Sequence, residues 1–111
     1  MPQPPDPRMT QTTQAVLRAL LEQPSAEMYG LEICARAELP SGTIHPILAR
    51  LEKLGWLESS WEEIDPHAQG RPRRRYYKLS PDGAERARIA LARATESRAM
   101  LRRLRAAGGG A

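Results

Sequence analysis

Four arginines share five consecutive positions of this chain, and their chemistry is that of anion recognition. The cluster follows Gly70 and consists of Arg71, Arg73, Arg74 and Arg75. Guanidinium groups donate paired hydrogen bonds to phosphate oxygens, and the neighbouring proline and glycine favour an extended loop. We expect the outer arginines to clamp phosphates or to enter a narrow minor groove. The alternative is an ion pair to the acidic stretch Glu62–Asp65, which we expect for Arg75.

A second group of candidate residues lies on the stretch Leu39–Leu57. Its apolar residues recur at three- and four-residue spacing and predict one buried helix face: Ile44, Ile47, Leu48, Leu51 and Leu54. Ser41 is the predicted N-cap, and Gly55 is the predicted stop because glycine enters the left-handed conformation without strain. The opposite face carries little bulk and consists of Gly42, Pro46, Ala49 and Lys53, flanked by His45 and Arg50.

A smooth helix face with cations suits close approach to a polyanion. His45 is the candidate for a base or phosphate contact, and Arg50 and Lys53 are candidates for phosphate contacts. The alternative for all three is an ordinary solvated surface. Because Trp56 follows this helix without a loop, the order is helix, strand, basic loop, strand, which is typical of a winged helix-turn-helix.

Catalytic chemistry finds little support in the sequence. There is no glycine-rich phosphate loop with a lysine, and no cluster of His, Cys and carboxylates at metal-ligand spacing. Ser41 and Ser80 are better explained as helix caps than as nucleophiles. The single cysteine, Cys34, excludes an internal disulfide and is expected to be a small buried residue. We predict neither an enzyme nor a cofactor or metal site.

Charge is unevenly divided along the 111 residues. Residues 1–70 hold 5 Lys/Arg and 10 Asp/Glu, a net of −5, whereas residues 71–111 hold 12 and 3, a net of +9. This asymmetry indicates one localised anionic partner. No stretch approaches the ~20 apolar residues of a membrane span. The N-terminus lacks the apolar core of a signal peptide, so we expect a cytoplasmic protein without a membrane partner.

The N-terminal half predicts three helices. Residues 1–9 are rich in proline and are expected to form a flexible tail. A first helix is expected over residues 10–22 and a second over 26–37, capped by Ser25. The inward-facing residues of the second helix are predicted to be Met28, Leu31, Cys34 and Ala35. The short link 38–40 joins it to the third helix, as in a helix-turn-helix.

Residues 56–79 predict a β-hairpin, with strands over 56–64 and 73–79 and a loop over 65–72. Two strands alone are marginally stable, so the pair is expected to pack on the helices through Leu57, Tyr77 and Leu79. The predicted fold class is mainly α with a small β-hairpin. Its parts are a flexible tail (1–9), a winged helix-turn-helix DNA-binding domain (10–80), a C-terminal dimerisation helix (81–105) and a flexible tail (106–111).

The last helix should begin at Pro81, because Ser80 can cap it and Asp82 favours the positive end of the helix dipole. Small and apolar residues recur along it like a short heptad seam: Ala87, Ala90, Leu91, Ala94, Ser97, Leu101 and Leu104. We expect this seam to pair with a second copy of the chain, because so long a helix needs a packing partner. The alternative is a solvated, projecting helix, which its seven arginines favour.

Three blocks of sequence stand in a characteristic order and spacing: MYGLEI (Met28–Ile33), LPSGTIHPILARLEKLGWLES (Leu39–Ser59) and GRPRRRYYKLSPDG (Gly70–Gly83). With these blocks the chain resembles the PadR family of transcriptional regulators. The resemblance covers most of Thr10–Gly83. It implies a homodimer that represses transcription, and many members of the family bind small molecules between their dimer helices. Two recognition helices about 34 Å apart would read a palindromic operator in double-stranded DNA. Release by a small-molecule effector that changes the angle of the C-terminal helices is a further hypothesis.

The resemblance also implies roles by position. The third helix would enter the major groove, the basic loop would lie along the backbone or minor groove, and the last helix would dimerise. The residues at the head of the recognition helix would be Ser41, Gly42, Thr43, His45 and Pro46. Tyr29 would meet a phosphate, and Arg71, Arg73 and Arg74 would belong to the wing.

The chain departs from the family pattern at two points. His45 stands where the family commonly has tyrosine; histidine keeps a donor, but its contact becomes sensitive to pH. Residues 81–111 contain no Trp, Tyr or Phe, so a flat aromatic pocket between dimer helices is not expected. An effector is instead expected near Trp56, Trp61 or Met100.

Two other functions stay open on the sequence. The first is a winged-helix protein-interaction module without specific DNA readout, which gives little reason for four arginines in one loop. The second is RNA binding, which is weaker because single-strand readers use stacked aromatic side chains and this chain has few that could be exposed.

Overall fold

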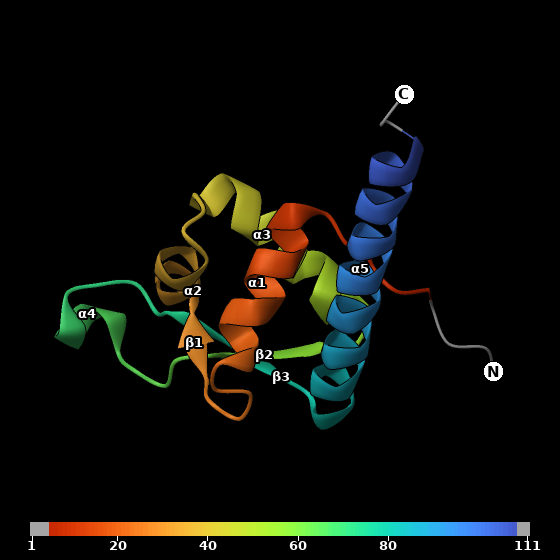
Figure 1. The fold of residues 1–111 in the computed structure, drawn as a ribbon. Helices are drawn as coiled ribbons and strands as arrows, with labels where there is room; N and C mark the ends of the chain where they lie inside the picture. Colours follow the sequence, from red (N-terminus) through yellow and green to blue (C-terminus); the bar gives the residue numbers. More distant parts are fainter. Residues whose placement is uncertain (1–4, 109–111) are drawn as a thin grey trace.

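The computed structural model describes residues 5–108, whose elements follow the order expected of a winged helix-turn-helix (Figure 1). They are α1 (Gln11–Leu21), β1 (Met28–Tyr29), α2 (Gly30–Ala37), α3 (Ser41–Lys53), β2 (Leu57–Trp61), α4 (Pro66–Gln69), β3 (Arg75–Leu79) and α5 (Pro81–Gly108). The fold is mainly helical. Its small antiparallel sheet has the order β1-β3-β2, so β3 pairs on both sides.

The core lies between α1, α2 and α3, against the sheet and the first half of α5. Its most deeply buried residues include Val16, Leu17 and Leu20 of α1, Ile33 of α2, and Ile44, Leu48 and Leu51 of α3. Met28, Trp56, Leu57 and Leu79 close it from the sheet side. The apolar spacing in α1 and α3 directs these side chains to one side of each helix, which confirms the core face predicted for α3.

Part of the predicted N-terminal tail is packed, which corrects the expectation for residues 5–9. Pro7 is buried and Met9 packs against the core. The Met9 carbonyl accepts a hydrogen bond of 2.7 Å from Gln14 Nε2, so the segment is tied to α1. Thr10 caps α1 by accepting from the Thr13 N–H at 3.2 Å. Residues 1–4 of the predicted tail lie outside the described residues.

The second helix begins later than the sequence predicts, at Gly30. Met28 and Tyr29 instead form β1, which pairs with Tyr77 and Tyr76 of β3. Residue 25, the predicted cap, lies in the turn before β1. Of the residues predicted to face inward, Met28 is buried and Cys34 packs against the core, whereas Leu31 is 70% exposed and Ala35 is exposed as well.

The recognition-type helix α3 keeps its predicted apolar face, but Ser41 is not its N-cap. Pro40 occupies that position, its carbonyl accepts from Thr43 and Ile44, and Ser41 is the first helical residue. Gly55 ends the helix with φ of 82°, in the left-handed region where the sequence places it. The chain then enters β2 directly, so the connection between α3 and the sheet is short and has little conformational freedom.

The hairpin loop contains a helical turn, α4, that the sequence did not predict. Asp65 caps this turn by accepting from the His67 N–H at 3.0 Å, and Gly70 ends it at φ of 65°. The strands on either side of the loop are shorter than predicted. In Figure 1 the loop extends away from the helices on the side opposite α5.

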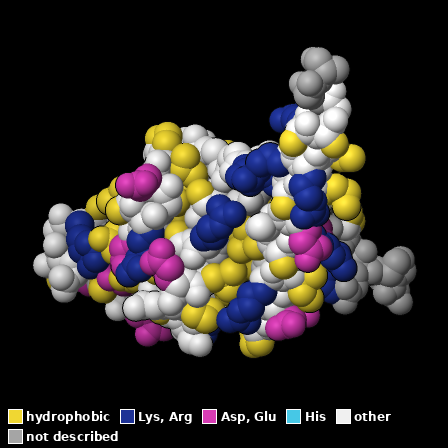
Figure 2. All heavy atoms as spheres, viewed as in Figure 1, with side chains coloured by type: hydrophobic (Ala, Val, Ile, Leu, Met, Phe, Trp, Pro, Cys, Tyr) yellow, Lys and Arg dark blue, Asp and Glu magenta, His cyan; other side chains and the backbone are white. Residues whose placement is uncertain are grey.

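The last helix starts where predicted and runs three residues further, to Gly108. Ser80 caps it by accepting from the Gly83 N–H at 2.9 Å. Its C-terminal half rises beyond the other helices, with apolar side chains on its surface (Figures 1 and 2). Residues 106–108 of the predicted second tail are therefore helical, and residues 109–111 lie outside the described residues. Within residues 5–108, no helix is long and apolar enough to cross a membrane.

Candidate nucleic-acid interface

The outer face of α3 is uncovered by the rest of the described chain. Its exposed residues are Ser41, Gly42, His45, Pro46, Ala49, Arg50 and Lys53, and Thr43 is half-buried. A Cβ added at Gly42 would meet nothing within 4 Å. The low-bulk face that the sequence predicts is therefore a surface, and a groove of DNA could approach its backbone closely.

A hollow of about 230 Å³ lies beside the start of α3. It is lined by Tyr29, Gly30, Leu31, Cys34, Ser41, His45 and Arg74. The Arg74 guanidinium lies over the Tyr29 ring, 4.4 Å from its centroid, and Tyr29 meets Tyr76 edge-on at 5.9 Å. This stacking holds a cation next to the first turn of α3, whose free N–H groups also attract anions. Residues from three separate elements thus form one anion-attracting surface.

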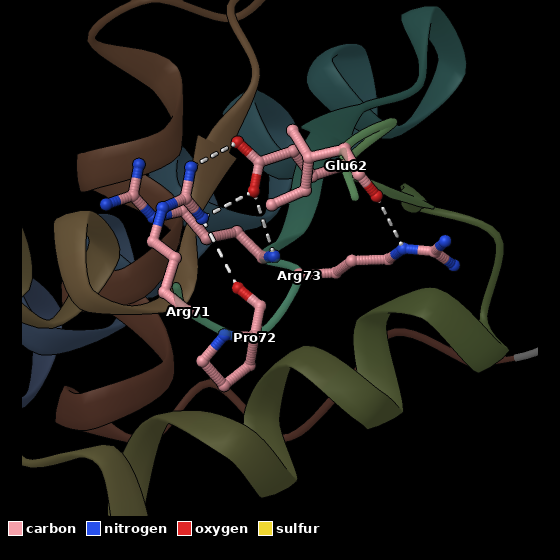
Figure 3. Close-up of polar contacts among 6 residues, drawn as sticks. Glu62, Arg71, Pro72 and Arg73 are labelled. Carbon is pink, nitrogen blue, oxygen red and sulfur yellow. Dashed lines mark hydrogen bonds and ion pairs between the residues drawn. The ribbon is translucent and has the colours of Figure 1, made fainter. Parts of the chain in front are cut away.

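Glu62 closes the base of the wing, the loop between β2 and β3 (Figure 3). Its carboxylate accepts from Arg71 Nη1 at 2.7 Å, from Arg71 Nη2 at 3.0 Å and from the Arg74 N–H at 3.2 Å. These bonds, chiefly those from Arg71, lower the pKa of Glu62 from 4.5 to about 2. The same contact raises the pKa of Arg71. Arg71, predicted as a DNA contact, is thus engaged inside the wing.

The remaining wing arginines differ in their engagement. Arg73 donates from Nε to the Ile64 carbonyl at 3.1 Å, and the rest of its guanidinium points away from Glu62 (Figure 3). Arg75 is paired, as expected, but its partner is Glu52 of α3 at 3.2 Å rather than the stretch Glu62–Asp65. Arg75 also donates to Ser59 Oγ at 2.8 Å. Its guanidinium lies 5.2 Å from the centroid of the Trp61 ring.

Two glutamates hold the wing arginines: Glu52, which the sequence did not single out, and Glu62, which it offered only within the acidic stretch that could pair with them. Glu52 accepts from both Ser59 and Arg75, and the bond from Ser59 is the main reason that its pKa is lowered. Glu62 holds the same end of the hairpin, because its partner Arg74 directly precedes Arg75. The sequence signal was the presence of carboxylates ahead of an arginine-rich strand, but only the folded chain shows which arginine each one pairs with.

A family model described as the transcriptional regulator PadR-like family matches residues 16–89, which include α3, the wing and the start of α5. The chain belongs to this family. PadR-like proteins are DNA-binding transcription regulators rather than enzymes, which agrees with the uncovered face of α3 and the cations beside it. No curated protein shows a significant sequence match to the chain.

Solved structures share the fold. A PadR family transcription regulator from Clostridium difficile R20291 is 20% identical with a TM-score of 0.61, over 91% of this chain and 100% of that chain. Disulfide-formed AbfR is 26% identical with a TM-score of 0.62, over 80% of this chain and 59% of that one. NadR in complex with 4-hydroxyphenylacetate is 21% identical with a TM-score of 0.59, over 83% of this chain. This chain thus spans 59% of the AbfR and NadR chains.

The predicted seam of α5 divides into two parts in this PadR-like protein. Ala87 and Ala90 are 0% and 3% exposed because they pack into the chain's own core, and Leu91 is partly buried against it. Ala94 is half-buried, whereas Ser97, Leu101 and Leu104 are exposed. The first two alanines therefore attach α5 to its own domain, and the surface open to a partner begins further along the helix.

The three residues expected near an effector lie in three different environments. Trp56 is buried in the core, Trp61 lies on the sheet beneath Arg75, and Met100 is on the projecting part of α5. Trp56 is the first residue after the left-handed Gly55, and this tight junction turns it inward. Together they do not form an effector pocket in the described chain.

Proposed function

We propose that this PadR-like protein is a homodimeric, sequence-specific repressor that reads a palindromic DNA operator and is released from it by a small-molecule effector. The observation that carries the proposal is the uncovered face of α3 beside the Tyr29–Arg74 pair. A helix with this little bulk fits the major groove, and the adjacent cation and helix N-terminus fit the phosphates that flank it.

The roles of the individual residues follow from their places on this surface. His45, Gly42 and Pro46 lie on the exposed face of the first turns of α3, where side chains reach base edges. Tyr29 and Arg74 lie beside that face and contact a phosphate. Arg50 and Lys53, exposed further along α3, contact the backbone, as does Arg73 on the wing.

Dimerisation is supported by the outer half of α5. The helix has 28 residues, about 42 Å of length. Met100, Leu101 and Leu104 are 56%, 51% and 62% exposed on the part that projects beyond the domain. A long helix with exposed apolar residues is stabilised by packing, and a second copy supplies an equal apolar surface. A two-fold axis would set two recognition helices about 34 Å apart, which requires a palindrome.

An effector site is supported by a hollow between the N-terminal segment and α5. This hollow has a volume of about 440 Å³, and its lining includes Met9, Gln14, Ala90, Ala94 and Leu101 together with Asp6, Arg93 and Arg98. Its apolar wall and two arginines suit an apolar molecule with an anionic group. A molecule bound there would touch α5 and α1 together, and so change the angle of α5 and the spacing of the half-sites.

The first test is selection of random duplex DNA by the purified protein, followed by sequencing of the bound fraction. We expect a palindrome with two half-sites one helical turn apart, or a multiple of it. The matched control is the same selection with a variant carrying Arg73→Ala and Arg74→Ala, which should recover little DNA at the same salt concentration. Binding without any sequence enrichment at every salt concentration would contradict the sequence-specific reader and favour a protein-interaction module.

A further inference from the structure

We propose that Glu62 is a positioning residue for DNA recognition: it fixes the backbone of Arg74 beside α3 and retains Arg71 inside the wing. Arg73 and Arg74 are then the wing cations that meet phosphate. This inference rests on the proposed function, because it concerns how the wing reaches DNA. It assigns a role in DNA binding to an acidic residue, whose negative charge alone would be expected to repel the DNA phosphates.

The first observation is that Glu62 holds residue 74 from both sides of its peptide backbone. The Glu62 N–H donates to the Arg74 carbonyl at 2.8 Å, and the Glu62 carboxylate accepts from the Arg74 N–H at 3.2 Å. These bonds lie just beyond the last paired residues of the hairpin, Trp61 and Arg75. The glutamate thus continues the ladder by one further residue, with its side chain supplying one of the two bonds.

The second observation is the bidentate contact with Arg71 at the other end of the loop. Glu62 is 15% exposed at its side chain, and Arg71 is 33% exposed. A phosphate that took Arg71 would have to break two charge-assisted hydrogen bonds and leave a poorly solvated carboxylate unpaired. Arg71 therefore closes the loop through its contacts with Glu62 (Figure 3), and in this proposal it does not contact DNA.

The third observation concerns Arg73 and Arg74, whose guanidinium groups do not pair with Glu62. The Arg74 guanidinium lies over Tyr29, in the hollow that Ser41 and His45 also line. Arg73 is exposed, and its Nη atoms make no hydrogen bond within residues 5–108. Because the backbone of residue 74 is held at the wing base, the position of its guanidinium beside α3 depends on Glu62.

Neutralising Glu62 is predicted to weaken DNA binding, which is the opposite of what electrostatic repulsion alone predicts. A carboxylate near DNA repels phosphates, so its neutralisation should tighten binding. Glu63 is the matched control, because it is the next residue on the same loop, is exposed, and forms no side-chain hydrogen bond or ion pair within residues 5–108. Glu63→Gln and Glu62→Gln change the net charge equally.

The experiment measures the affinity of the full chain for the selected palindrome, or for a mixed-sequence duplex of about 30 base pairs at low salt. We expect Glu63→Gln to bind as tightly as wild type or more tightly. Glu62→Gln should bind about tenfold more weakly, because it removes two charge-assisted bonds and the hold on Arg74. Hydroxyl-radical footprints of Glu62→Gln should lose the wing's protection and keep that of α3.

A double-mutant cycle gives a readout that a decrease in folded protein would not imitate. Arg74→Ala should weaken binding in the wild type and should add little in the Glu62→Gln background, because Arg74 is already misplaced there. Arg71→Ala is the second variant, and is informative even if Glu62→Gln folds poorly. It should leave the salt dependence of binding unchanged, whereas Arg73→Ala should reduce the slope by about one for each phosphate that it no longer neutralises.

Three results would overturn the inference alone: equal tightening by both glutamine variants, additive effects of Glu62→Gln and Arg74→Ala, or a reduced salt slope in Arg71→Ala. In each of these the wild-type protein still binds duplex DNA, so the proposed function stands. A wild-type protein that bound no duplex at any salt concentration would overturn the proposed function, and the inference with it.

Discussion

Gly83, in the first turn of α5, lies directly against the backbone of Trp56, which follows shortly after the end of α3. A Cβ added at Gly83 would lie 2.6 Å from Trp56 Cα and nearer still to the Trp56 carbonyl oxygen. Ser80 strengthens this contact: its N–H donates to the Trp56 carbonyl at 3.0 Å and its hydroxyl donates to the Gly55 carbonyl at 2.9 Å. The proposed dimerisation helix is thus attached to the end of α3, so its angle and that of α3 change together.

Gly83→Ala should destabilise the protein by about 1–3 kcal/mol, because the added methyl group forces α5 and Trp56 apart. Gly42→Ala is the matched control, since it adds the same group to the first turn of α3 where nothing lies within 4 Å. It should stabilise the helix by up to about 1 kcal/mol. Urea unfolding of both variants checks this, and equal stabilities would contradict the close contact at Gly83.

The stability of the wing should depend on pH through Glu62. Its pKa in the folded chain is about 2, below the ordinary 4.5. The stabilisation from the charged carboxylate is therefore fully present above about pH 4.5 and is lost as the pH falls toward about 2. Unfolding free energies measured across this range should fall more steeply for wild type than for Glu62→Gln. A carboxyl carbon of Glu62 that titrated near 4.5 by NMR would contradict the contact with Arg71.

The Glu52–Arg75 pair should couple α3 to the sheet weakly but measurably. Both side chains are about one-third exposed, so a double-mutant cycle to alanine should give about 0.2–1 kcal/mol. Glu58 and Lys78 are the control pair, because they face each other across β2 and β3 but form no ion pair within residues 5–108. They should give a smaller coupling. Arg75→Ala should also change the fluorescence of Trp61, because it removes the guanidinium over that ring.

His45 should contribute mainly to sequence specificity, and Arg50 mainly to affinity for DNA of any sequence. His45→Ala should relax base preference at one position of each half-site, at a cost of about 1–3 kcal/mol in discrimination. Arg50→Ala should weaken binding to all sequences similarly and reduce the salt slope by about one for each subunit. Binding curves on a palindrome and its single-base variants separate the two effects. If His45→Ala discriminates between bases as well as wild type does, His45 does not contact a base.

Leu101→Glu should convert the proposed dimer to a monomer, because it places a charge in the apolar surface of α5. Arg103→Glu is the control, since it lies two residues further along and thus on the other side of the same helix. Sedimentation velocity should show a monomer for the first variant and a dimer for the second. A wild type that sediments as a monomer at every concentration would contradict the dimer.

The elements that the sequence predicts well are those whose signals are local. The helices α1 and α3 and the start of α5 each carry their own apolar period, cap or stop, so their positions needed no knowledge of the rest of the chain. The strand β1 has two residues and no period. It exists because Met28 and Tyr29 find partners on β3, which only the folded chain brings near. Of the residues predicted to face inward from this segment, Met28 and Cys34 do so, whereas Leu31 and Ala35 are exposed.

The candidate site was predicted only in part, because some of its residues have local sequence signals and others depend on contacts between elements. Gly42, His45 and Pro46 lie on the surface that the spacing within α3 assigns to them. The partners of the arginines could not be read from spacing. Arg71 meets Glu62 because the loop between them folds back with a helical turn inside it. Arg75 meets Glu52 because β2 packs on α3 and pairs with β3, which brings Arg75 beside Ser59 and the last turn of α3.

The pairing of β1 with the central strand has a consequence for how the protein is made. Tyr29 and Arg74 stand at opposite ends of the helix-turn-helix and wing sequence, so their contact closes a long loop and should form late in folding. A nascent chain that has left the ribosome only as far as Gly55 already contains α3 but has neither the wing nor the middle of the sheet. The α3 of such a fragment therefore lacks the adjacent cation, so a fragment released by interrupted synthesis should compete poorly with the finished protein for the proposed DNA site.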